Sequence, residues 1–345
     1  MADLGRGAKG LAAFGILAAG VAVGALAERI ATRRLQTREF VGIESATGVT
    51  REVVTDDGVA LNVVVESEGV SADAPTVIFS HGYGLSLDSW PGQREALRGI
   101  ARVVLWDQRG HGRSERGGPG TTIERLGTDL GCVLDAVAPE GPVVLVGHSM
   151  GGMTIMALAD QRPDLFGDRV RGVALLATSA GGIADVDLGL PRPVARLAHR
   201  VAPSIGAALE SQGPVSGLIE RARRSSSDLG LLITRAYAFG STVPPDGTRI
   251  VADLINGTPF EVLADLLPAL QGHDKVHALH VLDRCDLLVM VGTSDLLTPV
   301  GHSYEIVRHT PSAELVILPG VGHMLTLEAV DDVNKHLRTL VERVG

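Results

Sequence analysis

The architecture of this chain follows from one segment, Pro142-Val143-Val144-Leu145-Val146-Gly147-His148-Ser149-Met150-Gly151-Gly152-Met153. Its first half is a short run of aliphatic residues, rich in valine, which is typical of a strand buried on both faces. The run breaks at Gly147, and a helical pattern then continues to Gln161. The sequence therefore predicts a buried strand, a sharp turn and a helix in immediate succession.

Ser149 occupies that turn, within the pattern Gly147-x-Ser149-x-Gly151. The pattern is typical of a nucleophile elbow, in which a strained strand-to-helix turn projects the serine hydroxyl away from the sheet. The two glycines allow the crowded turn to close without a clash from a Cβ atom. A short pattern also arises by chance, so a serine in an ordinary turn is the alternative. The position between a buried strand and a helix favours a nucleophile.

Apolar strands alternate with helical segments along most of the chain beyond residue 50. A hairpin with an Asp-Gly turn comes first, and the predicted buried strands that follow are 76–80, 102–106, 142–147, 170–177, 286–291 and 314–318. Almost wholly apolar strands that alternate with helices predict a parallel sheet covered by helices on both faces. Residues 181–273 interrupt this alternation, because their apolar residues follow a helical spacing that is broken by polar residues. We therefore expect an α/β core formed by 41–180 and 274–345, with 181–273 as an inserted helical cap.

The N-terminal segment contains 18 uncharged residues, 10–27, which is close to the minimum for a membrane-spanning helix. An uncleaved anchor, a cleavable signal peptide and a helix buried in the protein are the three interpretations. The arginines that follow at 29, 33, 34 and 38 oppose export, and by the positive-inside rule they place the body of the protein in the cytoplasm. We expect 1–40 to be an anchor helix with a basic linker, with export through a signal peptide as the alternative.

Charge and cysteine content limit the classes of partner. The formal net charge is -9, so an electrostatic attraction to nucleic acid is not expected. Cys132 and Cys285 lie far apart in a sequence with no disulfide framework, and we expect both to be free thiols. His277-x-x-His280 is the most closely spaced histidine pair, and it lies in a helical pattern without an evident set of metal ligands. We therefore expect neither a metal ion nor an organic cofactor.

A serine hydroxyl needs a base to remove its proton, and the base needs an acid to orient it. Ligands and catalytic groups of parallel sheets gather where the strands end, so the candidates are polar residues directly after strands. Asp295 follows the strand at 286–291, and His323 follows the strand at 314–318. The chain order Ser149, Asp295, His323 is the one expected for a nucleophile-elbow enzyme.

Each of these two residues has competitors. Asp295 could instead cap a turn, but the nearby carboxylates Asp283 and Asp286 precede the strand and so lie at its wrong end. The histidines that also follow strands, which are His81, His111 and His148, all precede the serine in the chain. Position in the chain therefore favours Asp295 as the acid and His323 as the base.

The oxyanion formed by attack of the serine needs two preorganised N–H donors. One is expected to be the backbone amide of Met150, at the positive end of the helix that follows the serine. The other is expected from the loop His81-Gly82-Tyr83-Gly84, which can expose the amide of Tyr83. We expect His81 and Gly82 to shape this loop, with no direct part in the chemistry.

These residues together resemble the α/β-hydrolase superfamily. The resemblance is carried by His81-Gly82-Tyr83-Gly84, Asp107-Gln108-Arg109-Gly110-His111-Gly112-Arg113-Ser114, Gly147-His148-Ser149-Met150-Gly151-Gly152, Asp295 and His323. It spans nearly all of residues 50–345 and implies a mostly parallel, doubly wound sheet with an inserted cap. It also implies that 107–114 shapes the surroundings of the site and is not part of the Ser-His-Asp triad.

A serine at the elbow is similar to the serine of esterases and lipases, and unlike the aspartate that epoxide hydrolases and haloalkane dehalogenases carry there. We expect a hydrolase that cleaves carboxylic esters of small molecules through an acyl-enzyme. An aliphatic cap and an apolar N-terminal segment both favour a lipophilic substrate. The alternatives are thioester, peptide or carbon–carbon bond hydrolysis, cofactor-free haloperoxidase or perhydrolase chemistry, and a non-catalytic ligand-binding member of the fold.

Overall fold

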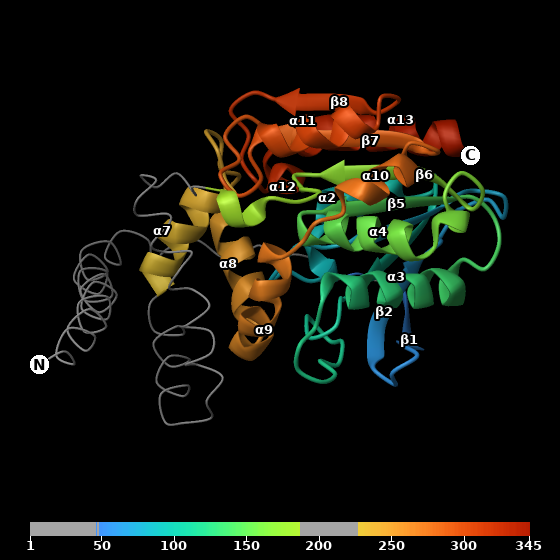
Figure 1. Cartoon of the computed structure of the whole chain (residues 1–345), viewed down its shortest axis with the longest axis horizontal. Coiled ribbons are helices and arrows are strands. Elements are labelled where there is room, and N and C mark those ends of the chain that lie inside the picture. Colours follow the sequence, from blue (N-terminus) through green and yellow to red (C-terminus); the bar gives the residue numbers. More distant parts are fainter. Residues whose placement is uncertain (1–45, 47, 187–226) are drawn as a thin grey trace, which may run out of the picture.

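The computed structural model describes residues 46, 48–186 and 227–345, and Figure 1 shows how their elements are arranged. The expected anchor helix at 10–27, its basic linker and the part of the expected cap at 187–226 lie outside these residues. Among the described helices, none has the length and apolar character needed to cross a bilayer.

Within the described residues, eight strands form one sheet with the order β1-β2-β4-β3-β5-β6-β7-β8. The strands are β1 (Val49–Val54), β2 (Ala60–Glu66), β3 (Thr76–Ser80), β4 (Arg102–Trp106), β5 (Val143–His148), β6 (Val170–Leu176), β7 (Asp286–Gly292) and β8 (Glu314–Leu318). β1 and β2 form an antiparallel hairpin, and β2 also pairs antiparallel with β4. All other neighbours are parallel. The predicted mostly parallel sheet is confirmed.

Helices cover both faces of this sheet. One apolar core lies between the sheet and α3 (Ile123–Val137), α4 (Met150–Gln161), α10 (Leu279–Leu282) and α11 (Val300–His309). A second core lies between the opposite face and α2 (Pro91–Leu97), α12 (Leu325–Glu328) and α13 (Val330–Val344). Because both faces are covered, β5 is buried along its whole length, which is why its sequence is a continuous apolar run.

Between β6 and α10, the described part of the chain contains the α-helices α7 (Ser227–Ala238), α8 (Gly247–Gly257) and α9 (Phe260–Gln271). They lie beyond the end of the sheet toward which the arrows of β6 and β8 point in Figure 1. Apolar side chains of α9 pack against α3 and the start of α4, while those of α7 and α8 pack against Leu85 and Met324. The helices therefore cover the edge of the sheet where the parallel strands end. We refer to α7–α9 and the connections between them as the cap.

Candidate functional site

Ser149 joins β5 to α4 in a strained backbone conformation, with φ 53° and ψ −118°. A residue with a side chain in such a region costs about 1–3 kcal/mol and persists only where the surroundings impose it. The surroundings are tight, because a Cβ atom on Gly147 would lie 2.5 Å from the carbonyl oxygen of Gly151. A Cβ atom on Gly151 would lie 1.9 Å from the carbonyl oxygen of Ser80. Both glycines are therefore required for the turn to close against β3.

Hydrogen bonds to β6 and the segment after it hold the backbone of Ser149 in this conformation. The amide of Ser149 donates to the carbonyl oxygen of Leu176 at 3.0 Å. Its own carbonyl oxygen accepts from the amide of Gly152 at 2.9 Å and from the hydroxyl of Thr178 at 2.6 Å. The elbow is thus tied to the neighbouring strand as well as to its own helix, and Thr178 is a part of this support that the sequence analysis did not identify.

Asp295 and His323 come together in the loops after β7 and β8. The Nδ1–H group of His323 donates to Oδ2 of Asp295 at 2.9 Å, and both side chains are buried. Asp295 also accepts from the amides of Leu297 and Thr298, both at 2.9 Å on Oδ1, and from the hydroxyl of Thr298 at 2.7 Å on Oδ2. This is a fully bonded carboxylate that holds the imidazole with Nδ1 protonated.

The ionisation state of Asp295 follows from these contacts. Burial favours the neutral acid and so raises its pKa, but the positive charge and hydrogen bond of His323 and the hydrogen bonds from Thr298 outweigh this effect. The pKa of Asp295 is therefore lowered to about 2. At neutral pH the carboxylate is ionised, which leaves Nε2 of His323 as the nitrogen that can accept a proton.

Ser149 and His323 line one cavity, which has a volume of about 380 Å³. Tyr83 and Gly82 line the same cavity, as do residues of the cap. The apolar side chains in its wall are Leu85, Met153, Ile183, Val186, Ala238, Val251, Ile255, Leu267, Leu270, Leu297 and Met324. Among the described residues that line it there is no aspartate, glutamate, lysine or arginine. The cavity is therefore suited to an uncharged, largely apolar molecule.

The two backbone amides expected to form an oxyanion hole are those of Met150 and Tyr83, and Tyr83 lines this cavity. Met150 is the first residue of α4, so its amide belongs to the helix N-terminus, where N–H groups have no carbonyl partner within the helix. On the loop after β3, the amide of Gly84 donates to Nε2 of His111 at 3.2 Å, and that of Leu85 donates to the carbonyl oxygen of Gly82 at 3.1 Å. The amide of Tyr83 directly precedes these two bonded amides in the chain.

Two buried histidines shape the loop that carries Tyr83. Nδ1–H of His81 donates to the carbonyl oxygen of Gly82 at 2.8 Å, and Nε2 accepts from the amide of Gln108 at 3.0 Å. Nδ1–H of His111 donates to the carbonyl oxygen of Arg109 at 3.1 Å. Burial lowers the pKa of His81 to about 4 and that of His111 to about 3, so both rings are neutral at neutral pH. With both nitrogens bonded, His81 supports the loop and has no free position for a proton.

The cap contacts the same loop directly. The hydroxyl of Tyr83 donates to the carbonyl oxygen of Leu263 on α9 at 2.5 Å, and the hydroxyl of Thr258 donates to the carbonyl oxygen of Gly84 at 3.1 Å. The loop that presents the Tyr83 amide is therefore held from the cap side as well as from the sheet.

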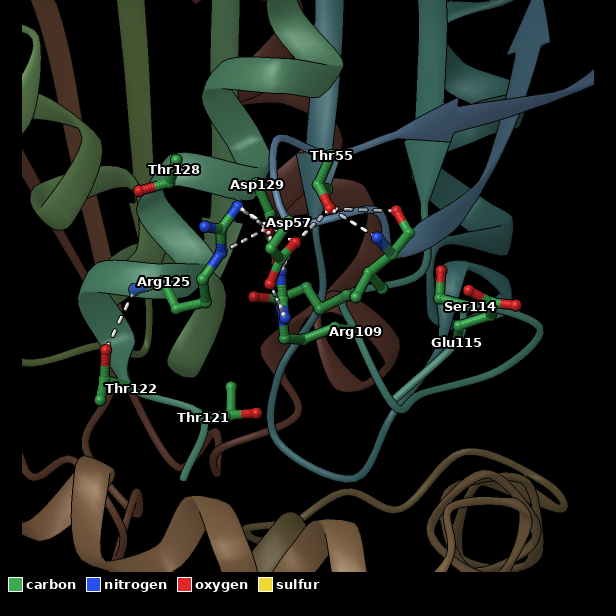
Figure 2. A network of polar contacts seen from close by, with 12 residues as sticks. Thr55, Asp57, Arg109, Ser114, Glu115, Thr121, Thr122, Arg125, Thr128 and Asp129 are labelled. Atoms are coloured by element: carbon green, nitrogen blue, oxygen red, sulfur yellow. Dashed lines mark hydrogen bonds and ion pairs between the residues drawn. The ribbon is translucent and has the colours of Figure 1, made fainter. Parts of the chain in front are cut away.

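A buried ion-pair network anchors the loop at 107–114 (Figure 2). The guanidinium of Arg109 binds Asp129 of α3 through Nε at 2.6 Å and Nη2 at 2.7 Å. It also binds Asp57, in the turn of the β1–β2 hairpin, at 3.0 and 3.2 Å. Arg125 reaches Asp129 as well, at 3.0 Å. Arg109 thus ties the loop at 107–114 to α3 and to the hairpin turn.

The histidine pair at 277 and 280 has its own partners. Nε2 of His277 bonds Oδ1 of Asp160 at 2.9 Å, and Nδ1–H of His280 donates to the carbonyl oxygen of His277 at 2.8 Å. In the part of the chain that the structure describes, no group of three or more histidine, cysteine, aspartate or glutamate residues is arranged to hold a metal ion.

The sequence analysis did not identify Thr298, which bonds Asp295 within the same loop. The sequence does contain a local signal for this contact. An aspartate at the end of a strand, followed three positions later by a hydroxyl residue, is typical of a turn in which the two side chains bond. The sequence analysis names His148 as an alternative candidate for the general base and predicts no other role for it. Burial and the nearby His323 lower its pKa to about 3, so it is neutral and lies beside His323 with ring centres 4.9 Å apart.

Comparison with known proteins gives consistent matches. Residues 75–330 match the family model of the alpha/beta hydrolase fold. The chain is 30% identical over 279 residues to the putative carbamate hydrolase RutD of Caulobacter sp. (strain K31), covering 77% of this chain and 90% of that protein. Its structure is similar to a thermophilic esterase from Thermogutta terrifontis, with a TM-score of 0.65 and 24% identity over 86% of this chain and 99% of the esterase. An enol-lactonase from Burkholderia xenovorans LB400 also has a TM-score of 0.65, with 23% identity over 85% of this chain and 100% of the lactonase.

Proposed function

This chain belongs to the alpha/beta hydrolase fold family, and we propose that it hydrolyses uncharged, lipophilic carboxylic esters with Ser149 as the nucleophile. Hydrolase activity follows from the family. The ester specificity and the triad of Ser149, His323 and Asp295 are the proposal. The observation that carries it is the buried Asp295–His323 hydrogen bond at 2.9 Å, on a histidine that lines the same cavity as the strained serine.

In the acylation step, Nε2 of His323 removes the proton from Oγ of Ser149 as Oγ attacks the ester carbonyl carbon. The carbonyl oxygen becomes an oxyanion, which accepts hydrogen bonds from the amides of Met150 and Tyr83. The carbon–oxygen bond to the alcohol then breaks, and the imidazolium returns its proton to the departing alkoxide. Asp295 stays ionised throughout and stabilises the imidazolium.

Deacylation repeats these steps with water. His323 takes a proton from a water molecule, whose oxygen attacks the acyl-enzyme carbonyl, and the same two amides hold the second oxyanion. The bond to Oγ of Ser149 breaks, the proton returns to the serine, and the carboxylic acid leaves. No redox step or cofactor enters this sequence.

The apolar wall of the cavity supports the lipophilic part of the proposal. A substrate carboxylate would be buried without a cationic partner among the described lining residues, which is costly. An apolar acyl chain gains roughly 0.8 kcal/mol for each methylene group that it buries. We therefore expect the specificity constant to rise with acyl length until the cavity is full.

The carbamate hydrolase named above supplies a second candidate substrate class, because it aligns over 77% of this chain. A carbamate carbonyl could be attacked by the same serine and its oxyanion held by the same amides. The carbonyl carbon of a carbamate is less electrophilic than that of an ester. Hydrolysis rates measured on an ester and a carbamate with the same leaving group therefore decide between the two substrate classes.

The test measures initial hydrolysis rates for p-nitrophenyl esters from acetate to dodecanoate, with Ser149→Ala as the control. Turnover that rises with chain length, and is lost in the variant together with labelling by a fluorophosphonate, would establish the proposal. Folded protein that turns over carbamates, thioesters, amides or diketones but no ester would overturn the ester assignment. Ligand binding without turnover on any of these classes would instead favour a non-catalytic member of the fold.

We also propose that residues 1–40 anchor the protein in a membrane with its hydrolase domain in the cytoplasm. The proposal is supported by the uncharged run at 10–27 and by the arginines that follow it. Fractionation of the full chain and of a chain lacking 1–40, each with a carbonate wash, tests it. Release of the full chain by the wash, or cleavage after residue 27, would contradict it.

A further inference from the structure

Two segments that are distant in the chain lie against each other beside the cavity. One is the segment 238–242, which consists of the last residue of α7 and the first residues after it and is here called the cap strap. The other is the loop at 320–324 that carries His323, here called the histidine loop. The amide of Met324 donates to the carbonyl oxygen of Ala238 at 2.7 Å. The cap therefore contacts the loop that carries the proposed base through its backbone.

The approach of these segments leaves no room for side chains between them. A Cβ atom on Gly240 would lie 2.1 Å from the carbonyl oxygen of Gly320, and one on Gly322 would lie 2.4 Å from the amide nitrogen of Gly240. The amide of Ser241 donates to the carbonyl oxygen of Gly320 at 2.7 Å. Glycine at both positions thus permits a direct backbone contact, and a shift of one segment has to move the other.

One carboxylate bonds both segments at once. Glu328, the last residue of α12, accepts at Oε2 from the amide of Gly240 at 2.9 Å and from the amide of Gly322 at 2.8 Å. Its Oε1 accepts from the amide of Thr242 at 3.2 Å. Three backbone N–H groups thus converge on the two oxygens of one carboxylate side chain.

We propose that Glu328 is a positioning residue that holds the histidine loop against the cap strap and thereby places His323 for proton transfer with Ser149. Gly322, which Glu328 bonds, directly precedes His323 in the chain. A consequence is that the cap strap stays docked during turnover, because its departure would remove partners from the histidine loop. The proposal rests on the role proposed above for His323, and it assigns Glu328 no contact with the substrate.

Glu328→Gln is the most direct test in the full chain. The side-chain amide offers one acceptor oxygen. Whichever way the amide is turned, its NH₂ group would face at least one of the three N–H donors, so these hydrogen bonds are weakened with little change in volume. Misplacement of a reacting group by about 1 Å can reduce a rate by roughly 100-fold. We expect kcat per active site to fall about 10- to 100-fold, with KM for an apolar p-nitrophenyl ester changed by less than about threefold.

The readout separates positioning from simple destabilisation. Labelling with a fluorophosphonate counts the reactive serines, and kcat is expressed per labelled site. A positioning role predicts nearly complete labelling, reached slowly, with a reduced kcat for each site. Fewer labelled sites with a wild-type kcat for each would mean that Glu328 only stabilises the fold, which would overturn the proposal.

The matched control is Glu305→Gln, which removes a partly exposed carboxylate of α11 bonded to Arg308 and His309. It should leave kcat and KM unchanged. If Glu328→Gln does not fold, Gly240→Ala tests the same contact with the carboxylate in place, because its Cβ would press on the histidine loop. The same fall in kcat per labelled site is expected, and an unchanged value would overturn the proposal. A wild-type protein with neither turnover nor labelling would contradict the proposed function itself.

Discussion

The imidazole of His148 donates from Nε2 to the backbone carbonyl oxygen of His323 at 3.0 Å. The residue that directly precedes the nucleophile thus holds the loop that carries the proposed base. The bond joins positions 175 residues apart, and it lies in a buried region where a lost partner is not replaced by bulk water. The spacing between elbow and base therefore depends on this histidine as well as on the strands.

Replacing His148 should impair both stability and turnover. His148→Ala leaves the buried carbonyl oxygen of His323 without this donor and removes the ring beside it, so we expect the free energy of unfolding to fall by about 2–3 kcal/mol. We expect kcat to fall roughly 10-fold or more, because the histidine loop can shift. Urea unfolding and ester kinetics measure the two effects. His309→Ala on α11 is the control, and equal behaviour of the two variants would contradict the role of His148.

Acid should destabilise the protein between pH 7 and pH 5. Burial lowers the folded-state pKa of His148 and His111 to about 3 and that of His81 and His273 to about 4, against about 6.5 in the unfolded chain. Below pH 6.5 the unfolded chain binds more protons than the folded protein, so the free energy of unfolding decreases as the pH is lowered. The loss at pH 5 is about 2 kcal/mol for each such histidine. Asp295, with a folded-state pKa of about 2, loses stabilisation only below about pH 4.

Chemical denaturation at pH 7 and pH 5 checks the sign and the size of this effect. His273→Leu removes one of the buried histidines at a position that does not line the cavity shared by Ser149 and His323. The difference in unfolding free energy between the two pH values should shrink in that variant by up to about 2 kcal/mol. An unfolding free energy that is flat or rises toward pH 5 in the parent protein would show that these rings are protonated in the folded state.

We expect kcat to depend on the hydroxyl group of Thr298 and only slightly on its methyl group. Its Oγ1 donates to Oδ2 of Asp295, the same oxygen that accepts the hydrogen bond from Nδ1 of His323. Thr298→Val removes a donor to the ionised carboxylate, so the pKa of Asp295 rises and the imidazole is held less firmly. We expect kcat to fall about 10-fold in Thr298→Val and to remain close to the parent value in Thr298→Ser. Equal rates in the two variants would show that the hydroxyl has no part in orienting the base.

Arg109 should be required for stability more than for chemistry. Arg109→Met leaves Asp129, which is fully buried, with Arg125 as its remaining cation, and removing one partner of a buried pair costs about 3–5 kcal/mol. Arg109→Lys keeps the charge but loses the planar fork that binds Asp129 through two nitrogens, so an intermediate loss is expected. Thermal and urea unfolding measure both variants. Arg98→Met, at an exposed ion pair with Glu95, should change stability by less than about 0.5 kcal/mol.

Much of the fold was visible in local patterns. The buried strands around the elbow and their helices were predicted because strands covered on both faces are continuous apolar runs and because glycines mark the turns between them. The pairing of Asp295 with His323 was predicted from position alone, since parallel strands bring the loops at their ends to one edge of the sheet. The helices expected within 187–226 and at 10–27 lie outside the described residues and stay predictions.

The sequence by itself determined the elbow at Ser149, the candidate acid and base, and the doubly covered sheet, because each depends on residues adjacent in the chain or on the order of strands. Only the tertiary structure decided that His148 supports His323 and that Glu328 bonds the cap strap to the histidine loop. These contacts join segments that are far apart in the chain. The sequence around a buried neutral histidine, or around a glutamate in a short helix, does not predict which residue it will bond. The packing of the loops against one another selects that partner, since a buried donor or acceptor has to find one within reach.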